Sequence, residues 1–251
     1  MKISIITATY NSAKTLEVCM NSVLNQTYQN IEYILIDGNS TDETLKLIKT
    51  KASEFKRIIW ISEKDKGIYD ALNKGIEKAT GDVIGFVHSD DFLADSSILN
   101  TIANIFETKN VDGVYGNLHY VNFDNVNHVV RNWKSQPFKK GLLSKGWMPA
   151  HPTLFLKSEI YRKHGSFSLD YRIAADYEFI LRIFKVNNYK FFYLPQTITK
   201  MRVGGASNRS LKNLILKTRE DYKAAKTNNI SSPFFAIGLK NLSKIPQWLS
   251  K

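Results

Sequence analysis

Two adjacent carboxylates, Asp90 and Asp91, follow directly after a short apolar run over Asp82–Val87 (DVIGFV). An apolar run of this length between turn-forming residues predicts a buried strand with parallel neighbours. In open α/β sheets ligands bind beyond the carboxyl ends of the strands, so we expect this pair at a binding site. Paired carboxylate oxygens suit Mg²⁺ or Mn²⁺, which in turn bind phosphate oxygens. The pattern alone leaves open an ordinary acidic loop ahead of a helix near Ser96.

The elements that must position this pair alternate strand and helix four times. Strands are predicted over residues 2–8, 31–36, 57–62 and 82–87, with helices starting near residues 12, 40, 68 and 96. Ser40–Glu43 (STDE) fits a capping box at the start of the second helix. Short connections of this kind are typical of βαβ units, which predicts an α/β fold with a mostly parallel central sheet flanked by helices.

After residue 110 the pattern becomes mixed. Strands are predicted over residues 111–121, 127–133, 154–156, 189–194 and 197–203, and an irregular loop over 139–149. Helices are predicted up to His164, over Ile173–Val186 and over 207–226, the last with an apolar stripe of Leu211, Leu214, Ile215, Tyr222 and Ala225. The sequence therefore predicts a smaller mixed β/α half followed by a helical tail.

Composition and charge narrow the class of protein. The chain has 251 residues, of which 43% are hydrophobic, as in ordinary globular proteins. A strand-like pattern begins at the N-terminus and no apolar run approaches about 18 residues, so we expect neither a signal peptide nor a membrane span. The single cysteine, Cys19, falls on the apolar face of the first helix, where we expect a buried filler. A chain without disulfides favours the cytoplasm.

The positive charge is concentrated at the C-terminus. Residues 200–251 hold 11 lysines and arginines against Glu220 and Asp221, which gives +9 of the chain's +12. Over 233–251 one helical side would carry Phe234, Phe235, Ile237, Leu239, Leu242, Ile245, Trp248 and Leu249, and the other Lys240, Ser243, Lys244 and Gln247. A basic, aromatic helix suits the surface of an anionic membrane, although Pro246 would kink it. A terminal helix docked on the domain fits the pattern equally well.

Five segments resemble, in order, the family 2 glycosyltransferases. They are ISIITATYN, LIDGNSTDET, EKDKGIYDALNKGIEKATGD, FVHSDDF and AADYEFILRI, and the similarity covers roughly residues 2 to 207. The resemblance implies an inverting, metal-dependent, nucleotide-sugar enzyme of the GT-A fold. It divides the chain into a GT-A domain over 1–206 and a basic helical extension over 207–251. Within the domain, 1–110 would be the nucleotide-binding half and 111–206 the acceptor and catalytic-base half.

The resemblance implies a donor site along the ends of the first four strands. Asp37 matches the carboxylate that accepts a hydrogen bond from the donor base, and an acceptor there suits the imide N–H of uracil, so a UDP-sugar is favoured. A turn-forming Asp before Gly38 is the alternative. Lys66 would reach the diphosphate, or else be a solvated surface charge. The full donor-side set is Thr7, Ala8, Tyr10, Asp37, Asp65, Lys66 and Asp90.

Asp90 matches the metal-binding aspartate of the family's DXD motif, and Asp91 beside it completes the expected ligands for Mn²⁺ or Mg²⁺. The chain departs from the common pattern at His88, where the first aspartate usually stands. It departs again at Leu72, where many members have an arginine. Tight metal binding is therefore less certain from sequence, and a phosphate contact must come from elsewhere.

Asp176 matches the catalytic base, which takes the proton of the acceptor hydroxyl as that oxygen attacks the anomeric carbon. The preceding acidic residue of many members is Ala175 here, and N-capping of the helix is the alternative role for Asp176. Trp147 and His151 fall where the family builds acceptor contacts. The implied acceptor is a glycan or a polyprenyl-diphosphate-linked saccharide of bacterial surface polysaccharide synthesis, reached from the inner face of the membrane.

Other classes fit the sequence less well. A catalytically weak or inactive nucleotide-sugar-binding relative stays open because of His88 and Ala175. A sugar-nucleotide pyrophosphorylase would need a Gly-rich basic loop after the first strand, which ATYNSAKT lacks. A nucleic-acid-binding protein would use the basic tail, but Asp37, Asp65 and the Asp90 pair would repel phosphates, so no nucleic-acid partner is expected.

Overall fold

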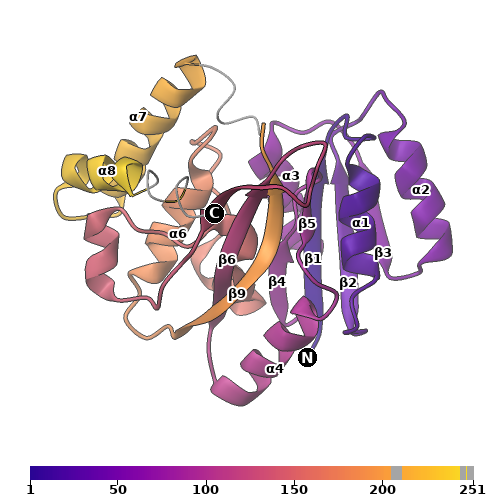
Figure 1. The fold of residues 1–251 in the computed structure, drawn as a ribbon, viewed down its shortest axis with the longest axis horizontal. Helices are drawn as coiled ribbons and strands as arrows, with labels where there is room; N and C mark the ends of the chain where they lie inside the picture. Colours follow the sequence, from indigo (N-terminus) through magenta and orange to yellow (C-terminus); the bar gives the residue numbers. More distant parts are fainter. Residues whose placement is uncertain (205–210, 244–246, 248–251) are drawn as a thin grey trace.

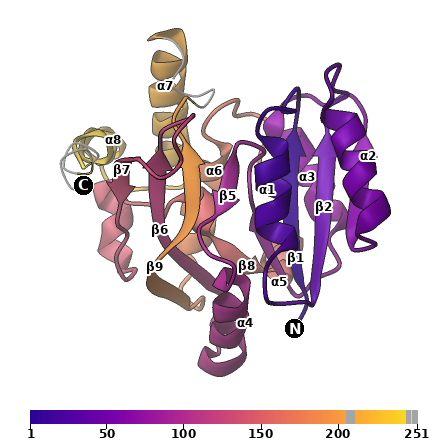
Figure 2. The ribbon, with the colours of Figure 1, turned by 45° about the vertical axis from the view of Figure 1, so that its right-hand side comes forward.

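The computed structural model describes residues 1–204, 211–243 and 247. Its described residues form one nine-stranded sheet with helices on both faces (Figures 1 and 2). The strands are β1 Ile3–Thr9, β2 Ile31–Asp37, β3 Ile58–Ser62, β4 Val83–Phe86, β5 Asp91–Leu93, β6 Gly113–Val121, β7 Val129–Trp133, β8 Phe155–Lys157 and β9 Phe191–Arg202. The helices are α1 Leu16–Leu24, α2 Thr44–Glu54, α3 Ile68–Lys78, α4 Ile98–Lys109, α5 Ser158–His164, α6 Ala175–Phe184, α7 Leu211–Thr227 and α8 Pro233–Leu242, with 3₁₀ turns η1 Lys140–Lys145 and η2 His151–Thr153.

The strand order is β3-β2-β1-β4-β8-β6-β9-β5, with β7 paired to β6. Strands β1 to β4 are all parallel, whereas β8 runs antiparallel to both β4 and β6. The predicted α/β class is therefore confirmed, with a parallel first half and a mixed second half.

The parallel strands are apolar along their whole length because both faces of the sheet are covered. Ile6 and Ala8 of β1 pack into the cluster that includes α3 and α6, whereas Ile3 and Ile5 pack into the cluster that includes α1 and α4. This alternation follows from the two-residue period of a strand. Cys19 lies in the second cluster and is fully buried, as predicted, and burial raises the pKa of its thiol to about 12.

Three details differ from the prediction. The two strands expected over 189–203 are one strand, β9, because it pairs with β6 along its length through shifts of register. The three-residue strand β5 is too short to leave a pattern and exists because it pairs with β9. The capping box is wrong: Ser40 Oγ donates to Asp37 Oδ1 at 2.5 Å instead, and α2 begins only at Thr44.

The C-terminal extension docks on the domain. The second half of α7 packs on α6 and buries Ala224 and Ala225, whereas its first half projects from the body (Figure 1). Of the predicted stripe, Leu214, Ile215 and Tyr222 are exposed and Ala225 is buried, so the packing face includes Ala225 but not the other three.

Helix α8 packs on η1 through Ala236, Ile237 and Lys240, which are all buried. The prediction that Lys240 lies on the solvent side is therefore wrong. Its ammonium is drawn inward because Asp221 of α7 is buried and its carboxylate binds Lys240 Nζ at 2.9 Å. The tail residues Lys244, Ile245, Pro246, Trp248 and Leu249 lie outside the described part of the chain.

Candidate active site

The carboxyl ends of the four parallel strands meet along one edge of the sheet. Thr9 at the end of β1 is in register with Asp37 at the end of β2, and Asp37 is in register with Ser62 at the end of β3. The turn that follows β4 is tied to the turn after β1 by a hydrogen bond of 3.0 Å between the hydroxyls of Ser89 and Ser12. Parallel pairing thus gathers polar side chains that are far apart in the sequence.

Asp37 is fully buried at this edge. Its Oδ2 accepts hydrogen bonds from Ser62 Oγ at 2.6 Å and from the Ser40 N–H at 3.1 Å, and its Oδ1 accepts from Ser40 Oγ. These donors stabilise a carboxylate away from water, because a buried charge needs hydrogen bonds. The sequence analysis assigned Ser40 to a capping box and gave Ser62, at the end of its strand, no role.

Next to Asp37, the residue Gly38 has no side chain, and Tyr10 and Asp65 lie beside it. A side chain at Gly38 would place its Cβ 2.6 Å from Asp65 Oδ2 and 3.4 Å from the Tyr10 ring, so glycine lets these two side chains approach. Tyr10 is 62% exposed, and Asp65 is partly buried, with Oδ1 accepting from the Gly67 N–H at 2.8 Å. An exposed aromatic ring beside a carboxylate can stack on a planar base. Lys66, the residue after Asp65, is exposed.

Thr7 and Ala8 are buried in the strand rather than in the turn. Thr7 Oγ1 donates to the Val87 carbonyl at 2.6 Å and lies 3.1 Å from the Tyr33 hydroxyl. The Thr7 hydroxyl thereby links β1 to the end of β4. These contacts of Thr7 hold the carboxyl ends of β1 and β4 next to each other.

The turn over His88–Asp91 carries the two adjacent carboxylates. Asp90 is partly exposed, whereas the Asp91 carboxylate is buried and neither oxygen accepts a hydrogen bond within the described residues. Burial, together with the neighbouring Asp90, raises the pKa of Asp91 well above its usual value. An unsatisfied buried carboxylate calls for a partner such as an ion.

This donor set fits a hard divalent cation. Mg²⁺ is commonly held by one or two carboxylates while substrate phosphates and water complete its shell. Within the described residues no group of three or more His, Cys, Asp or Glu side chains is arranged around one point for a metal. Asp90 and Asp91 would therefore hold the ion together with the substrate, not as a protein-only cage.

Arg202, at the end of β9, adds a positive charge to this turn, which the sequence reasoning missed. Its guanidinium Nη1 donates to the Asp90 carbonyl at 2.7 Å. Arg202 reaches this turn because β9 pairs with β5 and β6, and no local sequence motif indicates that contact.

The ring of His88, in this turn, and that of His151 are tilted by 41° to each other, with centroids 5.8 Å apart. His151 is buried against Phe86 and Phe167, and burial lowers its pKa to about 4 although Asp176 opposes the shift. Burial also lowers the pKa of His88, against the charges of Asp90 and Asp176. Both rings are therefore neutral near pH 7, and Asp176 is close enough to act on both.

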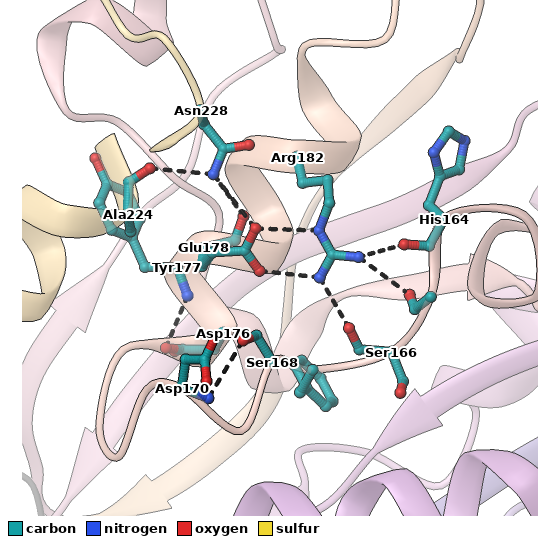
Figure 3. A network of polar contacts seen from close by, with 12 residues as sticks. His164, Ser166, Ser168, Asp170, Asp176, Tyr177, Glu178, Arg182, Ala224 and Asn228 are labelled. Carbon is teal, nitrogen blue, oxygen red and sulfur yellow. Dashed lines mark hydrogen bonds and ion pairs between the residues drawn. The ribbon is translucent and has the colours of Figure 1, made fainter. Parts of the chain in front are cut away.

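Asp176 stands in the first turn of α6, as predicted, and is partly exposed. Its Oδ1 accepts from the Tyr177 N–H at 2.8 Å (Figure 3) and from the Tyr69 hydroxyl at 3.2 Å. Within the described residues Oδ2 accepts no hydrogen bond. One oxygen is thus oriented by the protein, and the other remains for a substrate hydroxyl. Asp176 does not cap the helix, since the N-cap residue is Ala174.

The helix that carries Asp176 is fixed by a second polar network. The Arg182 guanidinium donates to both oxygens of Glu178, to the Ser166 carbonyl at 2.8 Å and to the His164 carbonyl (Figure 3). Arg182 thereby ties α6 to the loop after α5, and Asn228 links the same Glu178 to the end of α7. The network thereby fixes the backbone of α6, the helix that carries Asp176.

Trp147 lies apart from this site. It packs on Phe138, Tyr115 and Phe184, the last residue of α6. Asp176 is eight residues earlier on the same helix, which corresponds to about 12 Å along the axis. Trp147 therefore lies away from Asp176, whereas His151 contacts His88 in the turn that carries Asp90.

Comparison with known proteins identifies similar chains. The model of the family described as Glycosyl transferase family 2 matches residues 4–165. A PGL/p-HBAD biosynthesis glycosyltransferase of Mycobacterium bovis (strain BCG / Pasteur 1173P2) is 32% identical over 226 residues, covering 86% of this chain and 85% of that protein.

Two solved structures share the fold. The crystal structure of S. aureus TarS 1–349 in complex with UDP-GlcNAc gives a TM-score of 0.70 at 19% identity, covering 99% of this chain and 79% of that one. The mannosyltransferase PcManGT of Pyrobaculum calidifontis, in complex with GDP-Man and Mn²⁺, gives 0.68 at 19% identity, covering 99% and 73%.

Proposed function

Because the chain belongs to glycosyltransferase family 2, we propose that it transfers a sugar, with inversion, from a nucleoside diphosphate donor to a hydroxyl of a glycan or lipid-linked saccharide. A UDP-sugar is the favoured donor, and bacterial surface polysaccharide synthesis at the inner face of the membrane is the proposed setting. The observation that carries the proposal is a chain of contacts from Asp176 to the Asp90 turn. The Tyr69 hydroxyl lies 3.2 Å from Asp176 Oδ1 and its ring packs on Phe167, and His151 contacts both Phe167 and His88, which lies two residues before Asp90. These contacts support a proton acceptor on the side of the two carboxylates expected to bind the diphosphate end of the donor.

In this mechanism Asp176 Oδ2 takes the proton of the acceptor hydroxyl while Tyr69 and the Tyr177 N–H hold Oδ1. The oxygen attacks the anomeric carbon and the nucleoside diphosphate leaves from the opposite face, which inverts the configuration. Asp90 and Asp91 would hold Mn²⁺ or Mg²⁺, which supplies positive charge to the departing diphosphate. Arg202 adds fixed positive charge to the same turn. Tyr10 and Asp65 would receive the nucleoside, and Asp37 at the end of β2 would accept a hydrogen bond from the imide N–H of its base, which is why uracil is favoured.

Substitution of the base tests the catalytic part of the proposal. Asp176→Asn should lower kcat by about 10²–10⁴-fold, the usual contribution of a general base. The donor affinity, measured by calorimetric titration of the nucleotide-sugar, should stay within about twofold. Transfer at the wild-type rate by this variant would remove the base assignment. A wild type that binds donors and transfers nothing would favour the inactive relative, to which His88 and Ala175 point.

The donor is tested by thermal shift with UDP-, GDP-, CDP- and dTDP-sugars, each with and without Mn²⁺. Stabilisation follows from mass action, because a ligand that binds only the folded state raises the melting temperature. We expect the largest shift for a UDP-sugar with metal, and Asp90→Asn should remove the metal-dependent part. A shift that is equal with and without Mn²⁺ would contradict the role of Asp90 and Asp91.

The extension supports a peripheral membrane contact as a second part of the proposal. With Ala236, Ile237 and Lys240 of α8 buried, Phe234, Phe235 and Leu242 remain 85%, 62% and 60% exposed. Exposed aromatic residues on a basic segment suit an anionic lipid surface. Within the described residues no helix is long and apolar enough to cross a membrane.

Co-sedimentation with phosphatidylglycerol vesicles tests this contact. The double variant Phe234→Ser/Phe235→Ser should lose most of the wild-type binding, whereas Leu169→Ser, which changes a similarly exposed residue elsewhere, should retain it. Undiminished pelleting of the double variant would show that α8 is not the contact.

A further inference from the structure

The helix that carries Asp176 begins without a side-chain cap of its own. Its N-cap residue is Ala174, which has no side-chain acceptor. The first N–H groups of any helix need acceptors from elsewhere. The N-cap amide of Ala174 and the two amides before it bind a residue of a distant helix: Glu220 of α7 is only 8% exposed, and its carboxylate accepts from the N–H groups of residues 172–174.

Three hydrogen bonds join this carboxylate to three consecutive backbone amides. Glu220 Oε1 accepts from the Arg172 N–H at 2.9 Å, and Oε2 accepts from the N–H groups of Ile173 at 2.8 Å and Ala174 at 2.9 Å. A carboxylate at a helix N-terminus is further favoured by the helix dipole. Glu220 thus holds the N-cap amide of α6 and the two amides that lead into the helix, from a position 46 residues beyond Ala174.

The same short segment is held from its other side by α3. The Tyr69 hydroxyl donates to the Ile173 carbonyl at 2.6 Å and contacts Asp176 Oδ1 at 3.2 Å. The amides of 172–174 are therefore fixed by α7 and a carbonyl by α3. Asp176 follows two residues later, so these two contacts set where its carboxylate lies.

Glu220 differs in this respect from its neighbour. Asp221 forms ion pairs with Lys217 at 2.7 Å and Lys240 at 2.9 Å and so joins α7 to α8. Glu220 forms no ion pair with any described residue. Its charge is stabilised instead by the backbone amides of residues 172–174, just before α6. Two adjacent carboxylates thus serve two different contacts, which separates their roles experimentally.

We propose that Glu220 is a positioning residue for the general base, through which the C-terminal extension, beyond the matched residues 4–165, completes the active site. Docking of α7 supplies the acceptor that fixes residues 172–174, the segment that leads into α6. The proposal rests on the role of Asp176 under the proposed function.

The test compares Glu220→Ala and Glu220→Gln with the matched control Asp221→Asn. Glu220→Ala should lower kcat by about 10–100-fold while the KM for the donor stays within about twofold. Glu220→Gln should fall between this variant and the wild type, because one side-chain oxygen remains to accept. Asp221→Asn should lower the melting temperature at least as much as Glu220→Ala does, but its kcat should stay within about threefold of the wild-type value.

Amide hydrogen exchange gives a readout that does not depend on activity. Exchange over residues 172–177 should accelerate in Glu220→Ala and not in Asp221→Asn. If Glu220→Ala does not fold, Glu220→Gln takes its place in both measurements. The proposal is overturned if kcat falls in both Glu220→Ala and Asp221→Asn in proportion to the loss in melting temperature. It is also overturned if exchange over residues 172–177 rises in Glu220→Ala while its kcat is unchanged. Failure of the proposed function would show separately, as an Asp176→Asn variant that retains full activity.

Discussion

Lys240→Met removes the ammonium that joins α8 to the domain, and its cost can be worked from the structure. Asp221 is 1% exposed, and burial raises its pKa, but Lys240 and Lys217 outweigh burial and leave the pKa below its usual value. Removing one partner of a buried ion pair costs about 3–5 kcal/mol when the other charge is left alone. Lys217 remains beside Asp221 at 2.7 Å, so we expect a smaller cost of about 2 kcal/mol. The lost contact of Lys240 Nζ with the Tyr177 ring adds about 1 kcal/mol, since the site is desolvated.

Urea unfolding at pH 7 measures this change, with methionine preserving most of the apolar stem. The expected loss in the free energy of unfolding is about 3 kcal/mol. A double-mutant cycle with Asp221→Asn should give a coupling energy of about 1–3 kcal/mol, because the two charges touch. A loss below about 0.5 kcal/mol with additive single variants would refute the reasoning, as it would show that α8 does not dock through this pair.

Three further changes test other parts of the structure. Tyr69→Phe should lower kcat about tenfold, or about 1.4 kcal/mol, with unchanged donor affinity, since Asp176 loses its orienting hydroxyl; wild-type kcat would contradict this role. Gly146→Ala should release α8 and speed its proteolysis, because the new Cβ would lie 2.0 Å from the Ala236 carbonyl oxygen at a φ of +72°; unchanged proteolysis would contradict the docking. For Glu32, burial raises the pKa but hydrogen bonds lower it to about 2, so its carboxylate stabilises the fold above the unfolded pKa. The stability difference between wild type and Glu32→Gln, on the order of 3 kcal/mol at pH 7, should therefore shrink as pH falls from about 4.5 to about 2, and a constant difference would argue against it.

The local patterns sufficed for the parallel half of the fold. The apolar runs that became β1 to β4 are continuous because helices cover both faces, and a run of that kind is visible without any structure. Short elements were less accessible, because β5 has only three residues and is defined by its partner β9. The Ser40 turn was misassigned for a related reason: its hydroxyl binds Asp37 across the turn, and local spacing does not reveal that partner.

The extension shows where helical periodicity misleads. The helical wheel placed Lys240 on the side opposite the apolar residues, and lysine is usually exposed. The buried Asp221 lies on a different helix and reverses that preference, and the same docking leaves Phe234 in solvent. Amphipathic spacing gives the faces of a helix, but the charge of its neighbour decides which one is buried.

By itself, the sequence determined the α/β class, the order of the first four strands and helices, the family, and the presence of carboxylates at strand ends. These follow from local chemistry: apolar period, turn residues and short motifs. Only the tertiary structure decided that the hydroxyl of Tyr69 contacts Asp176, that Arg202 reaches the Asp90 turn, and that Glu220 binds the amides that lead into the helix of Asp176. Such contacts join residues more than 40 positions apart, and they exist only once strand pairing and helix packing have brought the two segments together.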